Sequence, residues 1–151
     1  MKLVPTAEMT LGPFFPREFA AGANDLTRQV SGEIIEITGR VTQLDGRPLD
    51  NVILEIWQAD PQGRYDNPDF LGWGRAATDA EGIYFFRTVK PGAPYINFLI
   101  LYSGLMRQLQ TRMYFDRVEG AERLIAKQEG PNRYRFDIRL RGDGETPFFD
   151  D

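Results

Sequence analysis

Residues 54–65, which read LEIWQADPQGRY, decide the fold. Alternate positions around the first half belong to two faces, one with Ile53, Glu55 and Trp57 and the other with Leu54, Ile56 and Gln58. Because Ile, Leu and Trp crowd into so short a run, this alternation favours a β-strand over a helix. We therefore predict a strand over residues 51–58 and work outward from it.

The second half of this stretch has the residues of a turn. Asp60-Pro61 begins the turn and Gly63 supplies an unrestricted backbone. The turn delivers Tyr65 and an acidic loop that contains Asp66 and Asp69. A strand that ends in a polar loop with a tyrosine is a candidate site, and an ordinary hairpin is the alternative. The two carboxylates could hold a divalent ion, although their spacing fits no calcium-binding loop.

The chain has 151 residues, which fits one domain over residues 1–151. A hydrophobic content of 42% and an aromatic content of 13% allow a substantial core. The net charge is −4 and no basic stripe with interleaved aromatic residues stands out, so nucleic-acid binding is not expected. The first residues lack the pattern of a secretory signal, and the longest apolar run is too short to span a bilayer. These features predict a soluble, cytoplasmic protein that does not bind membranes.

The sequence contains no cysteine and no histidine. Disulfides, structural zinc sites, cysteine nucleophiles and iron–sulfur clusters are therefore excluded. The serine–histidine–acid triad, the two-histidine iron site and an imidazole base are excluded as well. The remaining groups for chemistry are carboxylates, tyrosines, lysines and arginines, which can bind Mg²⁺ or Ca²⁺, or an anionic or aromatic ligand.

Short strands separated by turns are predicted along the rest of the chain, with little helix. Residues 1–32 are expected to form an N-terminal arm, and residues 117–127 a short helix or turn. Strands are predicted over residues 33–43, 51–58, 83–89, 93–102, 111–115 and 132–141. The Asp45-Gly46 turn predicts that the first two strands pair as a hairpin, with a bend at Gly39. This pattern indicates an all-β protein built as a β-sandwich.

Five stretches of the sequence resemble one family. They are TLGPFFP (10–16), GRVTQLDGRPLDNVILEIWQADPQGRYD (39–66), TDAEGIYFFRTVKPGAPY (78–95), TRMYFD (111–116) and YRFDIRLRGDGETPFFD (134–150). Together they resemble the intradiol ring-cleavage dioxygenases. The LIAK segment (124–127) and the tail resemble the alpha-type subunits of hetero-oligomeric members.

The resemblance implies a β-sandwich and a reaction in which O₂ cleaves a catechol-type ring between its two hydroxyls. In the family a non-haem Fe(III) with two tyrosine and two histidine ligands carries out this reaction. By position, Tyr65 corresponds to the first tyrosine ligand, and the loop of the second tyrosine is nearly absent. The His-x-His pair falls on Tyr95 and Asn97, neither of which is a histidine. No metal ligand set is therefore expected in this chain, and its own enzymatic role stays open.

This departure is consistent with an alpha-type subunit, which in the family binds no iron and forms one wall of the active site. The family then implies that Thr10, Gly12 and the position of Phe14 lie near the substrate. Phe14 lacks the hydroxyl of the tyrosine at the matching position, and Ser103 replaces an arginine of that pocket. The alpha-type subunits of the family serve a catechol that carries a carboxylate. Both changes weaken the expectation that this chain serves that substrate. The implied partner is an iron-bearing beta-type subunit, and the phenylalanine pairs near both termini are candidate docking anchors.

Two alternatives remain open. A stand-alone, iron-independent member would use Tyr65 and Tyr95 with charged residues, the candidates being Asp66, Asp69, Arg75 and Arg107. It would be a homo-oligomer with a pocket for a small aromatic ligand. There a tyrosine beside an arginine can act as an acid with a lowered pKa. A non-enzymatic binding domain is the other alternative, since residues 39–92 also resemble carboxypeptidase-regulatory-like and transthyretin-like β-sandwiches.

Overall fold

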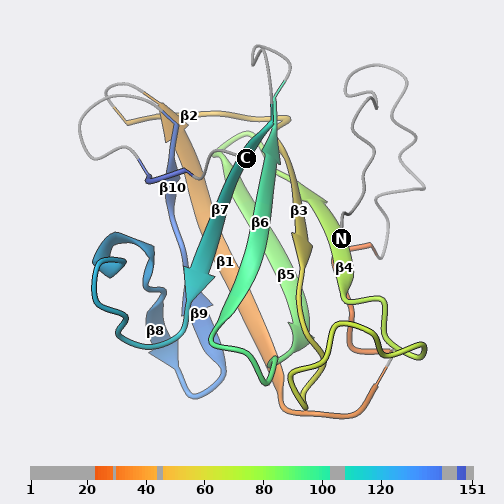
Figure 1. Cartoon of the computed structure of the whole chain (residues 1–151). Coiled ribbons are helices and arrows are strands. Elements are labelled where there is room, and N and C mark those ends of the chain that lie inside the picture. Colours follow the sequence, from red (N-terminus) through yellow and green to blue (C-terminus); the bar gives the residue numbers. More distant parts are fainter. Residues whose placement is uncertain (1–22, 29, 44–45, 103–107, 141–145, 149–151) are drawn as a thin grey trace.

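The computed structural model describes residues 23–28, 30–43, 46–102, 108–140 and 146–148. Its elements in chain order are β1 (Ile34–Gln43), β2 (Arg47–Pro48), β3 (Ile53–Trp57), β4 (Trp73–Ala77), β5 (Ile83–Val89), β6 (Tyr95–Leu101), β7 (Leu109–Tyr114), the 3₁₀ helix η1 (Glu122–Leu124), β8 (Lys127–Gly130), β9 (Arg133–Arg135) and β10 (Ile138–Arg139). Figure 1 shows these strands packed as two layers with long loops at both ends. No helix in the described ranges is long and apolar enough to cross a membrane.

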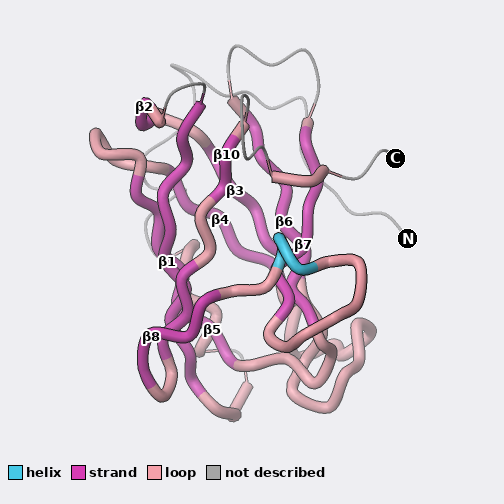
Figure 2. The backbone as a smooth tube through the Cα atoms, turned by 90° about the vertical axis from the view of Figure 1, so that its left-hand side faces the viewer, coloured by secondary structure: helices cyan, strands magenta, loops and turns pink. Residues whose placement is uncertain are grey.

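The two layers are separate sheets. A four-stranded antiparallel sheet has the order β4-β3-β6-β7. In the second sheet the order is β10-β1-β9-β8, with β2 and β5 also paired to β1. The side view of Figure 2 places β1 and β8 on one side and β6 and β7 on the other. This arrangement confirms the predicted all-β sandwich of the intradiol dioxygenase type.

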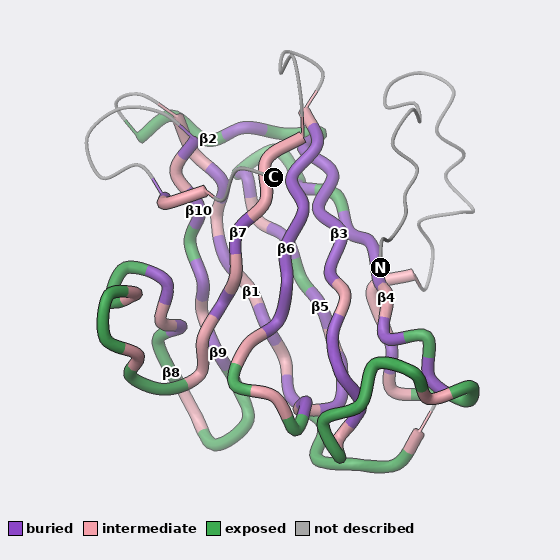
Figure 3. Tube along the Cα trace, in the orientation of Figure 1, coloured by how far each residue is buried: buried purple, intermediate pink, exposed green. Residues whose placement is uncertain are grey.

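Side chains that alternate along the strands fill the space between the sheets. Rings of Tyr84, Phe86 and Phe98 meet edge to face, and Phe136 packs against Phe98 with 5.3 Å between ring centroids. All four rings are at most 3% exposed. Such aromatic contacts add about 0.5–1.5 kcal/mol each beyond the area that they bury. Figure 3 shows the buried positions running along β3 and β6, and residues 96–101 of β6 are buried on both faces.

The predicted hairpin between residues 33–43 and 51–58 is wrong. β1 turns back into the two-residue β2, whose Arg47 pairs with Gln43, and Pro48 ends β2 because proline has no N–H to donate. The chain then crosses to the other sheet, where β3 pairs with β4 and β6. Asn51 has a φ of 60° at this crossing. β1 buries one face and β3 buries both. The sequence pattern identified both segments as strands but did not identify the neighbouring strand of each.

The predicted strand over residues 132–141 is divided. β9 and β10 both pair with β1 in the parallel direction, with Tyr134 opposite Ile37 and Ile138 opposite Val41. The main chain of Phe136, between them, passes against Gly39 so closely that a Cβ atom there would overlap its carbonyl. Gly39 is therefore a point of β1 at which only a residue without a side chain leaves room for the crossing main chain. Residues 117–127 contain η1, and β4 and β8 are strands that the sequence did not single out.

Candidate functional site

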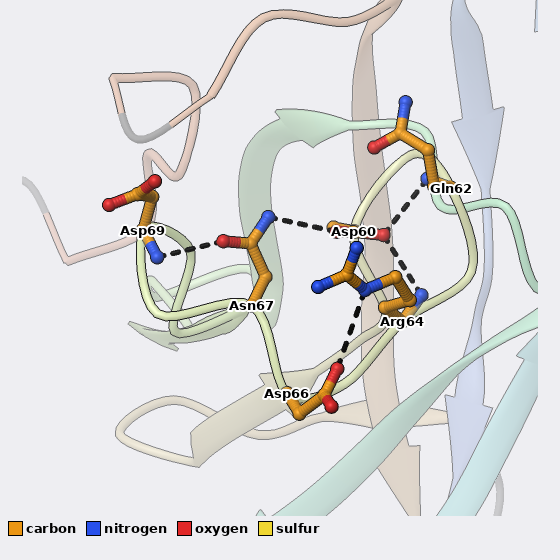
Figure 4. A network of polar contacts seen from close by, with 6 residues as sticks. All are labelled: Asp60, Gln62, Arg64, Asp66, Asn67 and Asp69. Atoms are coloured by element: carbon orange, nitrogen blue, oxygen red, sulfur yellow. Dashed lines mark hydrogen bonds and ion pairs between the residues drawn. The ribbon is translucent and has the colours of Figure 1, made fainter.

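The loop that follows β3 is organised by the carboxylate of Asp60, which is 1% exposed. Its Oδ1 accepts hydrogen bonds from the backbone N–H groups of Gln62 and Arg64, each at 2.9 Å. Its Oδ2 accepts one from Asn67 Nδ2 at 2.8 Å (Figure 4). The backbone bond from Arg64 is the main cause that holds the pKa of Asp60 below its usual value. An ionised Asp60 therefore fixes the course of residues 60–67, which carry Tyr65.

The same turn is tied to the connection between β5 and β6. Gly63 and Gly92 both donate backbone N–H groups to the carbonyl of Asp60 at 2.9 Å. Gly63 has a φ of 87°, a conformation that favours glycine. A side chain on Gly92 would lie 2.5 Å from Gly63 N, so the two backbones approach too closely for any other residue. This contact places the end of β3 beside the start of β6.

Tyr65 lies at the end of this loop and is 49% exposed. Its phenol is within hydrogen-bonding reach of the side chains of Tyr95 and Asn97. Partial burial raises the pKa of the Tyr65 phenol, and the neighbouring Tyr95 adds to that rise. The Asn97 amide and the positive charge of Arg112 act in the opposite direction without reversing it. Arg112 by itself thus lowers the pKa of the Tyr65 phenol, but burial and Tyr95 raise it overall.

The remaining groups come from neighbouring strands on the outer face of the four-stranded sheet. Asn97 on β6 is opposite Trp57 on β3 and Arg112 on β7, and its amide donates to the Trp57 carbonyl at 3.1 Å. Arg112 Nε donates to Asn97 Oδ1 at 3.2 Å. Its guanidinium carbon lies 4.3 Å from the centroid of the Tyr95 ring. Cation–π contacts of this kind are common for arginine.

The structure thus brings three of the predicted positions together, namely Tyr65, Tyr95 and Asn97. It adds Arg112, which sequence reasoning missed. The available signal was the alternation of residues 111–114, where Thr111 and Met113 are buried and Arg112 must face outward. Finding its role required the strand register, since only the pairing of β6 with β7 places it beside Asn97.

Other candidate residues lie apart from this cluster. Arg64 Nε contacts Asp66 at 3.5 Å on the exposed surface, and Asp69 N–H bonds to Asn67 Oδ1. Arg75 pairs with the buried Glu55. In the described part of the chain no three His, Cys, Asp or Glu side chains are placed to share a metal ion. Thr10, Gly12, Phe14, Ser103 and Arg107 lie outside the described residues.

Comparisons with known proteins define the class. The family model described as "Dioxygenase" matches residues 11–98, so the chain belongs to this family, the intradiol ring-cleavage dioxygenases. It is 36% identical to the protocatechuate 3,4-dioxygenase alpha chain of Pseudomonas putida over 79% of this chain and 77% of that protein. It is also 35% identical to the protocatechuate 3,4-dioxygenase beta chain of Burkholderia cepacia, over 77% of this chain and 68% of that one.

The fold agrees with this membership. The dioxygenase domain of a dioxygenase carbohydrate-binding protein fusion from Streptomyces sp. SirexAA-E superimposes with a TM-score of 0.65 and 28% identity. The match covers 89% of this chain and 96% of that domain. Similar identities to alpha and beta chains mean that overall similarity does not distinguish the two types.

The residues present do not fit the ferric ion of the family. In the family Fe(III) is held by two tyrosines and two histidines, and the sequence has no histidine. Burial raises the pKa of the Tyr65 phenol, which disfavours its phenolate, and Asn97 offers an amide that already bonds to Trp57 and Arg112. The guanidinium of Arg112 adds a fixed positive charge beside Tyr95. This donor set favours a cationic side chain over a metal ion.

Proposed function

We propose that this chain is an iron-free, alpha-type subunit of a hetero-oligomeric enzyme similar to protocatechuate 3,4-dioxygenase. In this proposal a second, histidine-bearing chain holds the iron, and the present chain forms one wall of the site. The observation that carries it is the convergence of Tyr65, Tyr95 and Asn97 with Arg112 where a family enzyme would hold its metal. A β-sandwich whose sequence has no histidine and no cysteine fits a supporting subunit.

The names of the relatives support the same assembly. Protocatechuate 3,4-dioxygenases contain chains named alpha and beta, and this chain is similar to both. The reaction of the assembled enzyme would insert both atoms of O₂ into a catechol-type ring and cleave the bond between the two hydroxyl-bearing carbons. Thr10, Gly12, Phe14, Tyr95 and Ser103 are the positions of this chain that we propose to lie toward the substrate. The losses at Phe14 and Ser103 favour a substrate other than the carboxylated one.

The test is to isolate the tagged chain from its own cells and to measure the mass, the chain composition and the iron content of the complex. We expect a second chain that contains a His-x-His pair, with iron in proportion to that chain. Catechol cleavage should be found in the complex and not in this chain alone. A complex that contains copies of this chain only would overturn the proposal.

The competing function is that of a stand-alone, iron-independent member, and the same cluster of phenols with an arginine is what favours it. Turnover or tight binding of a small catechol by the isolated homomer would support it. Because the pKa of the Tyr65 phenol is raised, Tyr65 is a weaker acid than this function would need, and we place it second.

A further inference from the structure

The guanidinium of Arg112 lies at the centre of the cluster that replaces the metal site. Its Nε bonds to Asn97 Oδ1 at 3.2 Å, and its carbon lies 4.3 Å from the centroid of the Tyr95 ring. Its charge also acts on the Tyr65 phenol. All three positions at which family ligands fall therefore interact with this one cation.

The position of Arg112 is imposed by the sheet. Its neighbours Thr111 and Met113 are at most 1% exposed and point toward the interior. Thr111 Oγ1 further bonds to the carbonyl of Pro147 at 2.8 Å. Because β7 is held in antiparallel register with β6, Arg112 lies opposite Asn97 and on the same face. The next pair on this face, Tyr95 and Tyr114, has ring centroids 5.4 Å apart and closes the far side.

A permanent cation here opposes metal binding by a route separate from the loss of ligands. Coulomb repulsion grows with the product of the charges, so a trivalent ion is repelled about three times as strongly as a monovalent one at the same distance. Arginine retains its proton at any physiological pH, and the repulsion cannot be relieved by ionisation. In a ferric site the positive charge beside the phenols comes from the metal ion. Here it comes from the guanidinium of Arg112.

We propose that Arg112 is a built-in cation that takes the place of the metal ion and keeps this chain free of iron, in addition to the missing histidines. The proposal rests on the family membership of the chain and on its own geometry. It does not depend on the proposed partner role, so each can fail without the other.

Restoring the two histidines with and without Arg112 separates the two causes. The variants are Y95H/N97H, Y95H/N97H/R112Q and, as a charge-preserving control, Y95H/N97H/R112K. Iron content after dialysis against Fe(III), Co(II) affinity by calorimetry and a visible phenolate-to-iron absorption band are the readouts. We expect the metal affinity of Y95H/N97H/R112Q to exceed that of Y95H/N97H at least about a hundredfold. The metal affinity of Y95H/N97H/R112K should stay close to that of Y95H/N97H. The exposed Arg117, replaced by Gln in the same background, should change nothing.

Equal metal affinity with and without Arg112 would overturn the proposal, and so would a folded triple variant that binds no metal. Replacement of Asn97 removes its bond to the Trp57 carbonyl and could prevent folding. The pair Y95H and Y95H/R112Q keeps Asn97 and is measured with Co(II) in that case. Tighter binding by Y95H/R112Q supports the proposal, and equal or weaker binding refutes it.

Discussion

At the scale of single residues, the loop that carries Tyr65 depends on one carboxylate, that of Asp60. The carboxylate of Asp60 accepts hydrogen bonds from two backbone N–H groups and from the Asn67 amide. The backbone carbonyl of Asp60 accepts hydrogen bonds from the N–H groups of Gly63 and Gly92. The sequence indicated Asp60 only as the start of a turn. Its capacity to join three segments depends on a fold that brings residues 60, 67 and 92 together.

We predict that Asp60→Asn lowers the melting temperature at neutral pH, because an amide cannot accept all the hydrogen bonds that the carboxylate accepts. The pKa of Asp60 is lowered in the folded state, so its contribution is present above the unfolded pKa near 3.8 and is lost as pH falls through the lower folded value. The difference between wild type and variant should therefore shrink in acid. Thermal melts between about pH 7 and about pH 2 measure this. The control is Asp66→Asn, whose side chain is 86% exposed and whose melting should hardly change.

A second residue-scale prediction concerns the phenol of Tyr65. Because the charge of Arg112 lowers its pKa against the larger effect of burial, Arg112→Gln should move the titration of Tyr65 to higher pH. The ultraviolet absorbance of phenolates, compared between each protein and its Tyr65→Phe derivative, isolates this group. Arg117→Gln is the matched control. A titration that stays in place or moves to lower pH after removal of Arg112 would show that the guanidinium does not act on Tyr65.

At the scale of elements, the strand β1 joins most of the second sheet. It pairs with β5 along one edge and with β9 and β10 along the other. Tyr84 on β5 donates its hydroxyl to the Phe136 carbonyl at 2.5 Å, beside Gly39. The main chain between β9 and β10 can pass this close to β1 because Gly39 has no side chain.

Gly39→Ala should therefore destabilise the fold strongly. An added Cβ would overlap the Phe136 carbonyl and lie 2.9 Å from the Tyr84 ring, so backbone as well as side chains must shift. We expect a loss of about 3 kcal/mol or more in the free energy of unfolding, above the usual cost of overpacking. Denaturant unfolding measures it. Gly130→Ala, whose added Cβ would meet only ordinary contacts from 3.6 Å outward, should stay within about 0.5 kcal/mol of wild type. Similar losses for the two variants would contradict this account.

The elements also show how far the sequence could be interpreted. Alternating or continuous apolar residues identified β1, β3, β5 and β6 because each strand buries one or both faces. Alternation says which face is buried and not which strand lies beside it, so the hairpin between β1 and β3 was predicted wrongly. Tyr65, Tyr95 and Asn97 were placed by family resemblance. Arg112 could not be, because its role comes from the register of β6 and β7.

At the scale of the whole molecule, the chain has the sandwich of an intradiol dioxygenase, and it has Tyr95 and Asn97 where the family resemblance places two histidines. The four-stranded sheet still presents the site face, and the loop after β3 still delivers its tyrosine. The residues of this site can change without loss of the fold, because the packed interior between the sheets does not include them.

If the active site is shared between two chains, a substitution in this chain should change how the substrate binds at the iron of the partner chain. We predict that Ser103→Arg, introduced into the isolated complex, lowers KM for a catechol that carries a carboxylate about tenfold, as one charge-assisted hydrogen bond would. The KM for unsubstituted catechol, kcat and iron content should stay unchanged, because the arginine would meet only the carboxylate. Steady-state kinetics with both substrates and metal analysis of the same samples measure these quantities, with Arg117→Gln as the control. A change in iron content, or an equal change for both substrates, would mean that position 103 does not line the pocket of the partner.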